Sequence, residues 1–469
     1  MVGAAAVLTG GLFAAAPSAL AATIDIQPGI YSHFLSPNQP PTTAECEAQI
    51  GIPCYDPAQL QTAYDEGPLF SQGINGKGQT IVIVDPFGSP TIQSDLTTFD
   101  QNFGLPDPPS FQIIQPAGPV PPFDPTNVDQ VGWAGETTLD VEWAHAMAPG
   151  ANILLAETPV DETEGTAGFA QIVQAENFVI ANHLGGVISQ SFGATEQTFG
   201  NVRNLLALRS AYVNAAQAGV TVLASTGDTG ATGQTNAGTL YTRPVTSWPA
   251  TDPLVTAVGG TQLTLDASGQ RTAPDVVWND TDNPTVNQLF FGNNGPNAIA
   301  TGGGQSAVFA RPSYQNAVAS TTRNRRGIPD ISMSAACSGP VITFQSFPGQ
   351  PTGFSLVCGT SEASPVFSGI VSLADQTAGH PLGLINPALY ELSAAHAPGL
   401  VDVTSGNNTV TFPQNNRLVT VRGQSAGAGY DLASGVGTVD AAQFVPELAQ
   451  AASSPAVLTA RVHGHGNVH

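Results

Sequence analysis

The sequence of 469 residues predicts an α/β fold with a central, mostly parallel sheet flanked by helices. Two observations support this prediction. Short apolar runs rich in β-branched residues are bounded by glycine or proline, as in strands buried on both faces. Helical stretches separate these runs, and that order gives right-handed crossovers within one parallel sheet. The expected strands are residues 80–85, 151–158, 185–192 and 219–226, and the expected helices are 136–147, roughly 166–183 and roughly 201–217.

The other segments lack such a pattern. Residues 23–53 are proline-rich and loop-like, and we expect them to form an N-terminal linker. Residues 260–310 are rich in Gly, Asn and Thr, which predicts surface loops or short antiparallel strands. The last residues, 453–469, contain three histidines, and we expect a disordered tail rather than a metal site.

Composition excludes several functions. The net charge is −23, so the chain could not neutralise the phosphates of a nucleic acid. Charged residues make up only 10% of the chain and hydrophobic residues 41%, which indicates a chain that forms a core rather than a disordered acidic one. No stretch has the length and composition that predict a transmembrane helix, so we expect no membrane partner.

The first residues and the cysteines indicate export. Residues 1–22 form an apolar run that ends in small residues, with a small-x-small pattern at residues 19–21, and we interpret them as a signal peptide. No Lys or Arg precedes this run, which leaves open a start upstream of Met1. Of the three possible pairings of four cysteines, we favour Cys46–Cys54 with Cys337–Cys358 over four free thiols. We therefore expect a secreted, extracellular protein.

The most specific local motif is CGTSEASPVFSGIVSLADQ at residues 358–376. A turn of small residues places Ser361 at the start of a helix, where first-turn N–H groups and the helix dipole favour a developing negative charge. That environment suits a nucleophile that attacks a carbonyl group. Ser361 could instead only cap the helix. The pattern G-T-S-x-x-x-P is more specific than a cap requires, so we interpret Ser361 as the nucleophile.

A serine nucleophile needs a base, and no histidine motif supplies one. Asp85, at the end of the first expected strand, fits the first place of an Asp–His–Ser order, but the histidine place is not filled. His145 lies late in its helix, and we expect it to pack near the helix end. Three further histidines have no supporting motif, namely His183, His380 and His396.

Two carboxylates occupy the stretch where a catalytic helix would carry that histidine. Glu136 and Asp140 are four residues apart in GETTLDVEWAHAMAPGA (135–151), so both project from one helix face. A close carboxylate pair can hold a proton, which lets one group act as base while the other orients it. In isolation, the pair is better explained as two unrelated surface carboxylates. Glu142 falls off this face, and we expect it to be solvated.

Several segments, in this order, resemble the sedolisins, a family of serine-carboxyl peptidases. They are Glu136-x-x-x-Asp140, SFG (191–193), ASTGDTG (224–230) and GTSEASP (359–365), with further similarity at CYDPAQLQTAYD (54–65), SWPATDPLVTAVGGT (247–261), TGGGQSAVF (301–309) and RGIPDIS (326–332). The resemblance extends over most of residues 54–445. It implies a subtilisin-like, three-layer peptidase domain, for which we expect the bounds 54–452.

The resemblance also implies roles for individual residues. Ser361 is the nucleophile, Glu136 the general base and later acid, and Asp140 the partner that orients Glu136. Asp228 takes the oxyanion place, where a neutral carboxyl group donates a hydrogen bond to the tetrahedral intermediate. Such a group stays neutral in a dry site or at low pH, so we expect activity at acidic pH. On local sequence alone, Asp228 is also explained as a turn residue.

One structural calcium ion is implied near the C-terminal end of the domain. By the resemblance, Asp402 and Asp431 supply carboxylates, while Val403, Gly427 and Gly429 supply main-chain carbonyl groups. Such a set suits a hard cation that takes six or more oxygen ligands. Without the resemblance, a glycine-rich turn with solvated aspartates is the simpler interpretation.

Taken together, these features predict a secreted serine-carboxyl endopeptidase that acts on proteins or peptides at acidic pH as a monomer. One alternative is a tripeptidyl-peptidase of the same superfamily. Another is a non-catalytic binding protein on a peptidase scaffold, which the presence of all four catalytic positions argues against. Sedolisins generally carry a large N-terminal prodomain. Only about thirty residues separate the expected signal peptide from residue 54, so we expect no large prodomain in this stretch. Either the prodomain is lost, or it is encoded elsewhere, or Met1 is a start site that truncates a longer chain.

Overall fold

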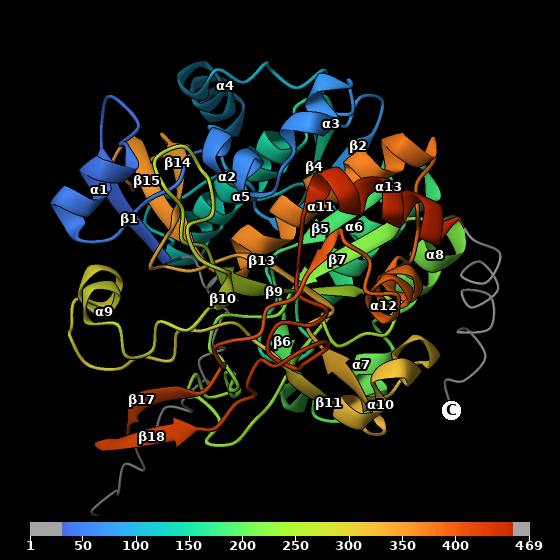
Figure 1. Cartoon of the computed structure of the whole chain (residues 1–469). Coiled ribbons are helices and arrows are strands. Elements are labelled where there is room, and N and C mark those ends of the chain that lie inside the picture. The colour runs from blue at the N-terminus through green and yellow to red at the C-terminus, as the bar shows by residue number, and fades with distance from the viewer. Residues whose placement is uncertain (1–30, 454–469) are drawn as a thin grey trace, which may run out of the picture.

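A central sheet of eight strands organises the chain in the computed structural model, which describes residues 31–453 (Figure 1). Seven strands follow the order β10 (Val276–Val277), β9 (Thr256–Gln262), β7 (Thr221–Ser225), β5 (Val187–Gln190), β2 (Thr80–Pro86), β4 (Asn152–Thr158) and β3 (Phe111–Ile114), and β13 (Ile331–Ser334) also pairs with β9. All these pairings are parallel except that of β10 with β9. The predicted α/β class and parallel sheet are confirmed. The expected signal peptide at 1–22 and the tail beyond residue 453 lie outside the described residues.

Alternating side chains of the central strands face two separate hydrophobic cores. In β2, Ile81 and Ile83 belong to one core, while Val82 and Val84 belong to the other. Strand β4 alternates in the same way. The sequence of each of these strands must therefore be apolar throughout, because neither face of the sheet meets water.

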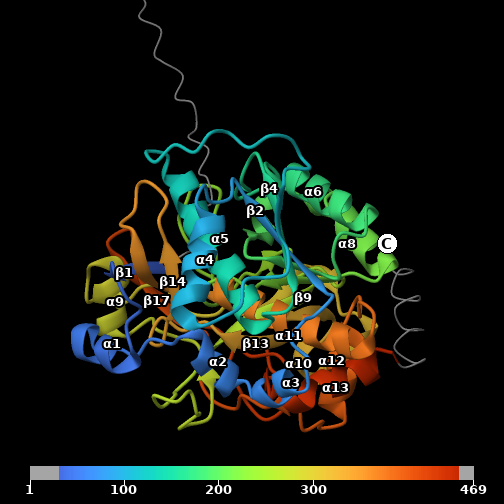
Figure 2. The same cartoon turned by 90° about the horizontal axis from the view of Figure 1, so that it is seen from above.

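Helices cover both faces of this sheet (Figure 2). The helices α5 (Val128–Met147) and α11 (Thr360–Ala378) pack on one face, and α6 (Phe169–Ala181) and α8 (Ser210–Ala218) pack on the other. A further layer lies outside α5 and α11, formed by α4 (Ile92–Phe103), α12 (Asn386–Ala394) and α13 (Ala441–Ala452). Because α5 and α11 have neighbours on several sides, both are buried along most of their length.

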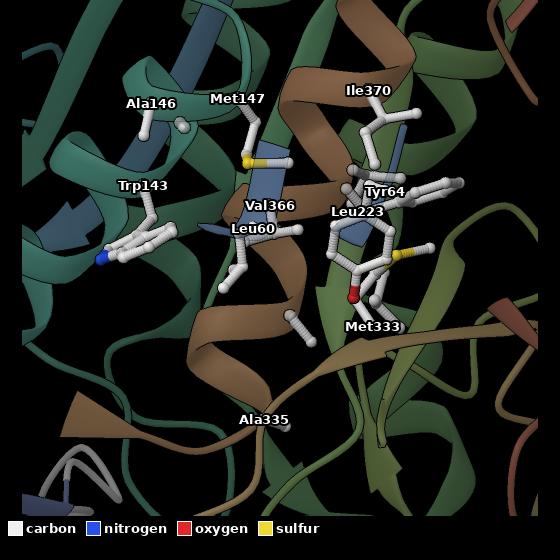
Figure 3. Packing of buried hydrophobic residues seen from close by; sticks show 14 of the residues in the cluster. Leu60, Tyr64, Trp143, Ala146, Met147, Leu223, Met333, Ala335, Val366 and Ile370 are labelled. Carbon is white, nitrogen blue, oxygen red and sulfur yellow. The ribbon is translucent and has the colours of Figure 1, made fainter. Parts of the chain in front are cut away.

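The core between α5 and α11 is apolar. Figure 3 shows Trp143, Ala146 and Met147 of α5 beside Val366 and Ile370 of α11, and all five side chains are fully buried. This packing fixes the two helices that carry most of the expected catalytic residues.

The expected N-terminal linker has more structure than predicted. Among its described residues, β1 (Tyr31–Ser36) pairs antiparallel with β15 (Gly353–Cys358), which also pairs with β14 (Val341–Gln345). Helix α1 (Thr43–Ile50) follows and begins with a capping box between Thr42 and Glu45. The loop-like interpretation of residues 31–50 was therefore wrong, because a strand partner more than 300 residues away does not show in local composition.

The disulfide bonds connect the cysteines as predicted. One bond joins Cys46 to Cys54, and the other joins Cys337 to Cys358. The second bond involves the first residue of the motif that carries Ser361, and it ties β15 to the segment after β13.

Residues 260–310 were predicted to form loops or short strands, and they also contain a helix. Helix α9 (Pro284–Phe291) begins after Asn283, whose side chain accepts the first-turn N–H groups of Thr285 and Val286. This helix has only eight residues, about two turns, which is too short for a helical periodicity to show in the sequence.

Smaller elements complete the described chain. They are α2 (Pro57–Ala63), α3 (Gly67–Ser71), β6 (Ala194–Thr195), η1 (Glu196–Phe199), α7 (Val202–Leu206), β8 (Ser247–Trp248), β11 (Gly304–Ala310), η2 (Ser313–Val318), α10 (Ala319–Thr322), β12 (Arg325–Ile328), β16 (Leu400–Val401), β17 (Val410–Gln414), β18 (Arg417–Val421) and β19 (Thr438–Val439). Within residues 31–453, no helix combines the length and apolar character needed to cross a membrane.

Candidate active site

Ser361 lies in the first turn of α11. The chain turns at Gly359, between the end of β15 and the start of this helix. Gly359 has a φ of 132°, a backbone conformation that side chains rarely adopt. A Cβ atom at this position would also lie 2.6 Å from Asp228 Oδ2. Glycine is therefore required at the start of this turn, and it allows the Asp228 carboxyl group to approach the helix end beside Ser361.

The two carboxyl groups of the predicted pair lie on α5 and are fully buried. The Ser191 hydroxyl donates to Asp140 Oδ1 over 2.8 Å and also lies 3.3 Å from the carbonyl oxygen of Ser361. Ser191 directly follows β5, so one hydroxyl group connects the sheet edge to both α5 and α11. The structure thus brings Glu136 and Asp140 to the helix end that carries Ser361.

Glu136 is the carboxyl group that acts most directly on Ser361. Burial raises the pKa of Glu136 well above its usual value, and interaction with the Ser361 side chain lowers it. The negative charges of Asp85 and Asp228 raise this pKa further. No hydrogen bond of ordinary length and angle reaches either Glu136 oxygen in this structure. Apo active sites often show such loose geometry, which tightens when substrate binds.

Asp228 lies in the loop after β7 and bonds to the start of α11. Its Oδ1 atom accepts hydrogen bonds from the backbone N–H and the hydroxyl group of Thr360, each at 2.7 Å. Burial raises the pKa of Asp228 to about 6, although the two Thr360 bonds act in the opposite direction. Since Oδ1 already accepts two bonds, Oδ2 is the atom free to carry the proton and to donate.

A third carboxyl group stands behind the pair on α5. Asp85, at the end of β2, is fully buried and interacts with the side chains of Thr137 and Asp140. Burial raises the pKa of Asp85 to about 7, against the effect of these two contacts. Sequence reasoning considered Asp85 only for a histidine-based triad, and the structure places it against Asp140 instead. Three adjacent buried acids cannot all be ionised, so they share protons.

Two further polar side chains of α5, Glu142 and His145, are buried away from Ser361. Glu142 was expected to be solvated, and this was wrong, because it is fully buried and accepts the Phe344 N–H over 3.0 Å. His145 packs near the end of α5 as expected. Its Nε2 atom lies 2.8 Å from the Pro106 carbonyl oxygen and 3.3 Å from Asp100, so the ring is held by α4 and the loop after it.

A cavity of about 110 Å³ opens beside Ser361 and Asp228. It lies at the carboxyl ends of β4, β5 and β7, where ligands bind in open α/β sheets. Sequence reasoning missed two of its acidic residues, Glu162 and Glu164, which lie in the loop between β4 and α6. Tyr31 of β1 is not among the residues that line the cavity, but burial and the charge of Asp228 raise its pKa.

The residues expected to bind calcium also lie together. Asp402 Oδ2 accepts the Gly429 N–H over 2.8 Å, and Asp431 Oδ2 accepts the Gly427 N–H over 3.0 Å. The carbonyl group of Val403 faces the same turn, because the Ser434 hydroxyl bridges it and Asp431. Two carboxylates and the Val403 carbonyl group thus lie at one turn, and oxygen donors of this kind are the ligands that a calcium ion takes.

The sheet, the serine at a helix start and its buried carboxyl partners define a serine peptidase on a subtilisin-like fold. A model of the subtilase family matches residues 130–389. Kumamolisin from Bacillus sp. (strain MN-32) is 30% identical over 441 residues, which cover 92% of this chain and 70% of kumamolisin. The chain belongs to the sedolisin family of serine-carboxyl peptidases.

Other relatives agree with this assignment. Sedolisin from Pseudomonas sp. (strain 101) is 30% identical over 394 residues, but the match covers only 60% of its length. The structure of Pseudomonas sedolisin, a serine-carboxyl proteinase complexed with pseudo-iodotyrostatin, matches with a TM-score of 0.67 and 29% identity, over 84% of this chain and 97% of that chain. Tripeptidyl-peptidase 1 from Rattus norvegicus is 31% identical over 66% of this chain and 50% of its own length.

Proposed function

We propose that this protein is an endopeptidase that hydrolyses peptide bonds within proteins at acidic pH. The observation that carries the proposal is that Glu136 of α5 interacts with the side chain of Ser361 on α11, with Asp140 one helical turn along α5. Ser361 also lines one cavity with Asp228, which follows β7. These residues come from three separate segments, and each has a distinct role in acyl transfer.

Ser361 and Glu136 carry out the proton transfers. The Ser361 hydroxyl oxygen attacks the scissile carbonyl carbon while Glu136 accepts its proton. Glu136 then gives this proton to the nitrogen of the leaving amine, and the C–N bond breaks to leave an ester on Ser361. Water hydrolyses that ester with Glu136 again as base. Asp140 and Asp85 lie behind Glu136, and burial raises the pKa of both, so they share protons with Glu136 and position it.

Asp228 stabilises the tetrahedral intermediate. In its neutral form, Oδ2 donates a hydrogen bond to the oxyanion, as a protonated carboxyl group does in other oxyanion holes. Its raised pKa of about 6 keeps this group neutral at acidic pH. The charge state of Asp228 therefore favours acid conditions.

The alternative that a specific observation favours is a tripeptidyl-peptidase. Several relatives at about 30% identity carry that name, including those of rat and of Aspergillus fumigatus. Digestion of a long denatured protein across pH 2–8, with mass spectrometry of the products, tests the proposal. Internal cleavage by the wild type and none by Ser361→Ala supports an endopeptidase. Release of only N-terminal tripeptides contradicts it.

We also propose one structural calcium ion and export. Asp402 and Asp431 would hold calcium through carboxylates, together with the carbonyl groups of Val403, Gly427 and Gly429. When bound, the ion would supply positive charge that attracts the carboxylates of Asp402 and Asp431, and so would hold the segment near residue 402 to the turn at 427–431. Two disulfide bonds support folding in an oxidising compartment outside the cytosol.

A further inference from the structure

The cavity beside Ser361 contains two carboxyl groups that the proposed mechanism does not use. Glu162 and Glu164 both line it, together with Ser191, Asp228, Ser247 and Ser361. Both lie in the loop between β4 and α6, outside the motifs that identified the catalytic residues. We call this cavity the acidic pocket.

Glu162 is buried without a complete set of partners. Its side chain is only 1% exposed, and its Oε2 atom has no hydrogen bond. Burial raises its pKa well above the usual value. A buried acceptor without a donor is costly, so a donor that enters the pocket would gain this interaction.

Glu164 is better held and fixes the position of the second carboxyl group. Its Oε2 atom accepts the Thr195 N–H over 3.0 Å, and contacts with Thr195 and Thr198 lower its pKa. Burial outweighs these contacts and raises the pKa to about 7. The Thr195 bond anchors this loop residue to the segment that follows β5.

The groups whose charges act on Glu162 are all acidic. They are Asp161 and Glu164 on the same loop and Asp85 on β2, and Glu162 in turn acts on Glu136 of α5. A bound cation would balance the negative charge of these carboxyl groups, and it would also give Glu162 Oε2 a hydrogen-bond donor.

We propose that the acidic pocket binds the lysine or arginine side chain of the substrate residue that supplies the scissile carbonyl group. Glu162 and Glu164 are then specificity-determining residues. The pocket borders Ser361 and Asp228, which act on the carbon and the oxygen of that carbonyl group. The substrate side chain nearest to Ser361 and Asp228 therefore belongs to the residue that supplies this carbonyl group. This inference rests on the proposed peptidase function and adds its substrate preference.

The free N-terminal amine of a peptide from which a tripeptide is released is a less suitable occupant of the acidic pocket. An extended chain rises about 3.3 Å per residue, so that amine would lie roughly 10 Å from the scissile bond. The acidic pocket, in contrast, directly adjoins Ser361.

The preference should depend on pH in one direction. A bound cation favours the ionised carboxylate, so binding lowers the pKa of Glu162 and Glu164 and releases protons in acid. Selection of lysine over an uncharged side chain of equal length therefore strengthens as pH rises from about 4 towards 7. Glu136 and Asp228 titrate with both substrates, so a ratio of rates removes most of their contribution. The remainder comes from the charge of Glu162, which acts on Glu136.

The experiment compares peptides that differ only in lysine or norleucine before the scissile bond, each with a free or an acetylated N-terminus. We measure kcat/KM between pH 3.5 and 6.5 for the wild type, Glu162→Gln, Glu164→Gln and the double variant. Glu391→Gln, at an exposed position of α12, is the matched control. We expect a lysine-to-norleucine ratio of roughly tenfold or more at pH 6, falling in acid. The double variant should bring the ratio close to one, while the control keeps it.

Two results overturn the inference. One is an unchanged ratio in the double variant, and the other is a preference that acetylation abolishes, which would assign the pocket to the amine. If the wild type cleaves neither peptide, the proposed function fails, and the pocket is tested separately. Binding of the same uncleaved peptides to Ser361→Ala, measured by calorimetry, must then favour lysine in the presence of Glu162 and Glu164, or the inference is also wrong.

Discussion

Gly369 of α11 touches the backbone of α5 at Met147. A Cβ atom at Gly369 would lie 2.5 Å from the Met147 Cβ atom and 3.3 Å from the Ala144 carbonyl oxygen. The two helices therefore cross at a distance that only glycine permits. Because α5 carries Glu136 and α11 carries Ser361, this contact sets the distance between base and nucleophile.

Enlarging Gly369 should impair stability and activity together. Gly369→Val forces α5 and α11 apart, and overpacking of this kind costs about 1–3 kcal/mol. We expect a lower melting temperature and a lower kcat in the fraction that remains folded. Gly67→Ala is a suitable control, because a Cβ atom at Gly67 meets nothing within 4 Å. A Gly369→Val variant with unchanged kcat would show that the crossing does not set the catalytic geometry.

Replacing the proposed base should remove activity without unfolding the protein. Glu136→Gln cannot accept the proton of Ser361, so we expect kcat to fall by about 10²–10⁴. The substitution also removes a buried carboxyl group, which should not lower stability at neutral pH. His145→Gln should retain kcat, since its ring contacts Pro106 and Asp100 instead. A folded but inactive His145→Gln variant would support a histidine base.

Sequence patterns predicted the scaffold well because they reflect local physics. Strands buried on both faces must be apolar throughout, and the runs at β2, β4, β5 and β7 show this. The same reasoning failed for Glu142, since a helix buried on several sides has no solvated face. It also failed for β1, where Tyr31 pairs with Cys358 and the partner strand is distant in sequence.

The candidate site was predictable in part. The motif around Ser361 and the spacing of Glu136 and Asp140 are local features, and the structure brings these residues together. The positions of Asp85, Glu162 and Glu164 depend on which strand ends become neighbours in the sheet. A single carboxylate carries no sequence signal for such a neighbourhood. Glu162 and Glu164 therefore emerged only from the structure, and Asp85 had been considered only for a histidine-based triad.

Removal of calcium should lower thermal stability. A ligand that binds only the native state stabilises it by about 2.7 kcal/mol at 100 times its dissociation constant. We expect excess chelator at pH 6 to lower the melting temperature, and Asp402→Asn or Asp431→Asn to lower it in the same way. Chelator should then have little further effect on either variant. A melting temperature that is unaffected by prolonged chelation would contradict the calcium proposal.

Glu66 should make the protein less stable as pH rises. The side chain is fully buried, neither oxygen has a hydrogen-bond partner, and burial raises its pKa well above the usual value. The native state therefore holds this proton more tightly than the unfolded state. Below the ordinary pKa of about 4.3 both states are protonated, and stability falls as pH rises from there towards the raised pKa.

Denaturant unfolding between pH 3 and pH 8 measures this effect. Glu66→Gln stays neutral at every pH, so its stability should exceed that of the wild type at pH 8. The difference should shrink towards pH 3. Glu391→Gln serves again as the exposed control. Equal pH dependence in Glu66→Gln and the wild type would show that Glu66 does not contribute.

Asp228 should set part of the alkaline limit of activity. Burial raises its pKa to about 6, so the neutral donor is present below that pH and is lost as pH rises through it. An ionised carboxylate would repel the oxyanion, at a place where electrostatics contributes most. Asparagine is a neutral donor of similar shape that does not titrate here. We expect Asp228→Asn to keep measurable kcat/KM and to lose part of the alkaline decline, whereas Asp228→Ala should lose about 10²–10³ in kcat.

Only part of the pH profile of activity should move in the Asp228 variants, because Glu136, Asp140 and Asp85 titrate together. The pH profiles of kcat/KM for the three folded proteins decide the matter, and equal, near-complete loss in the Asn and Ala variants would mean that Asp228 does not act as the donor.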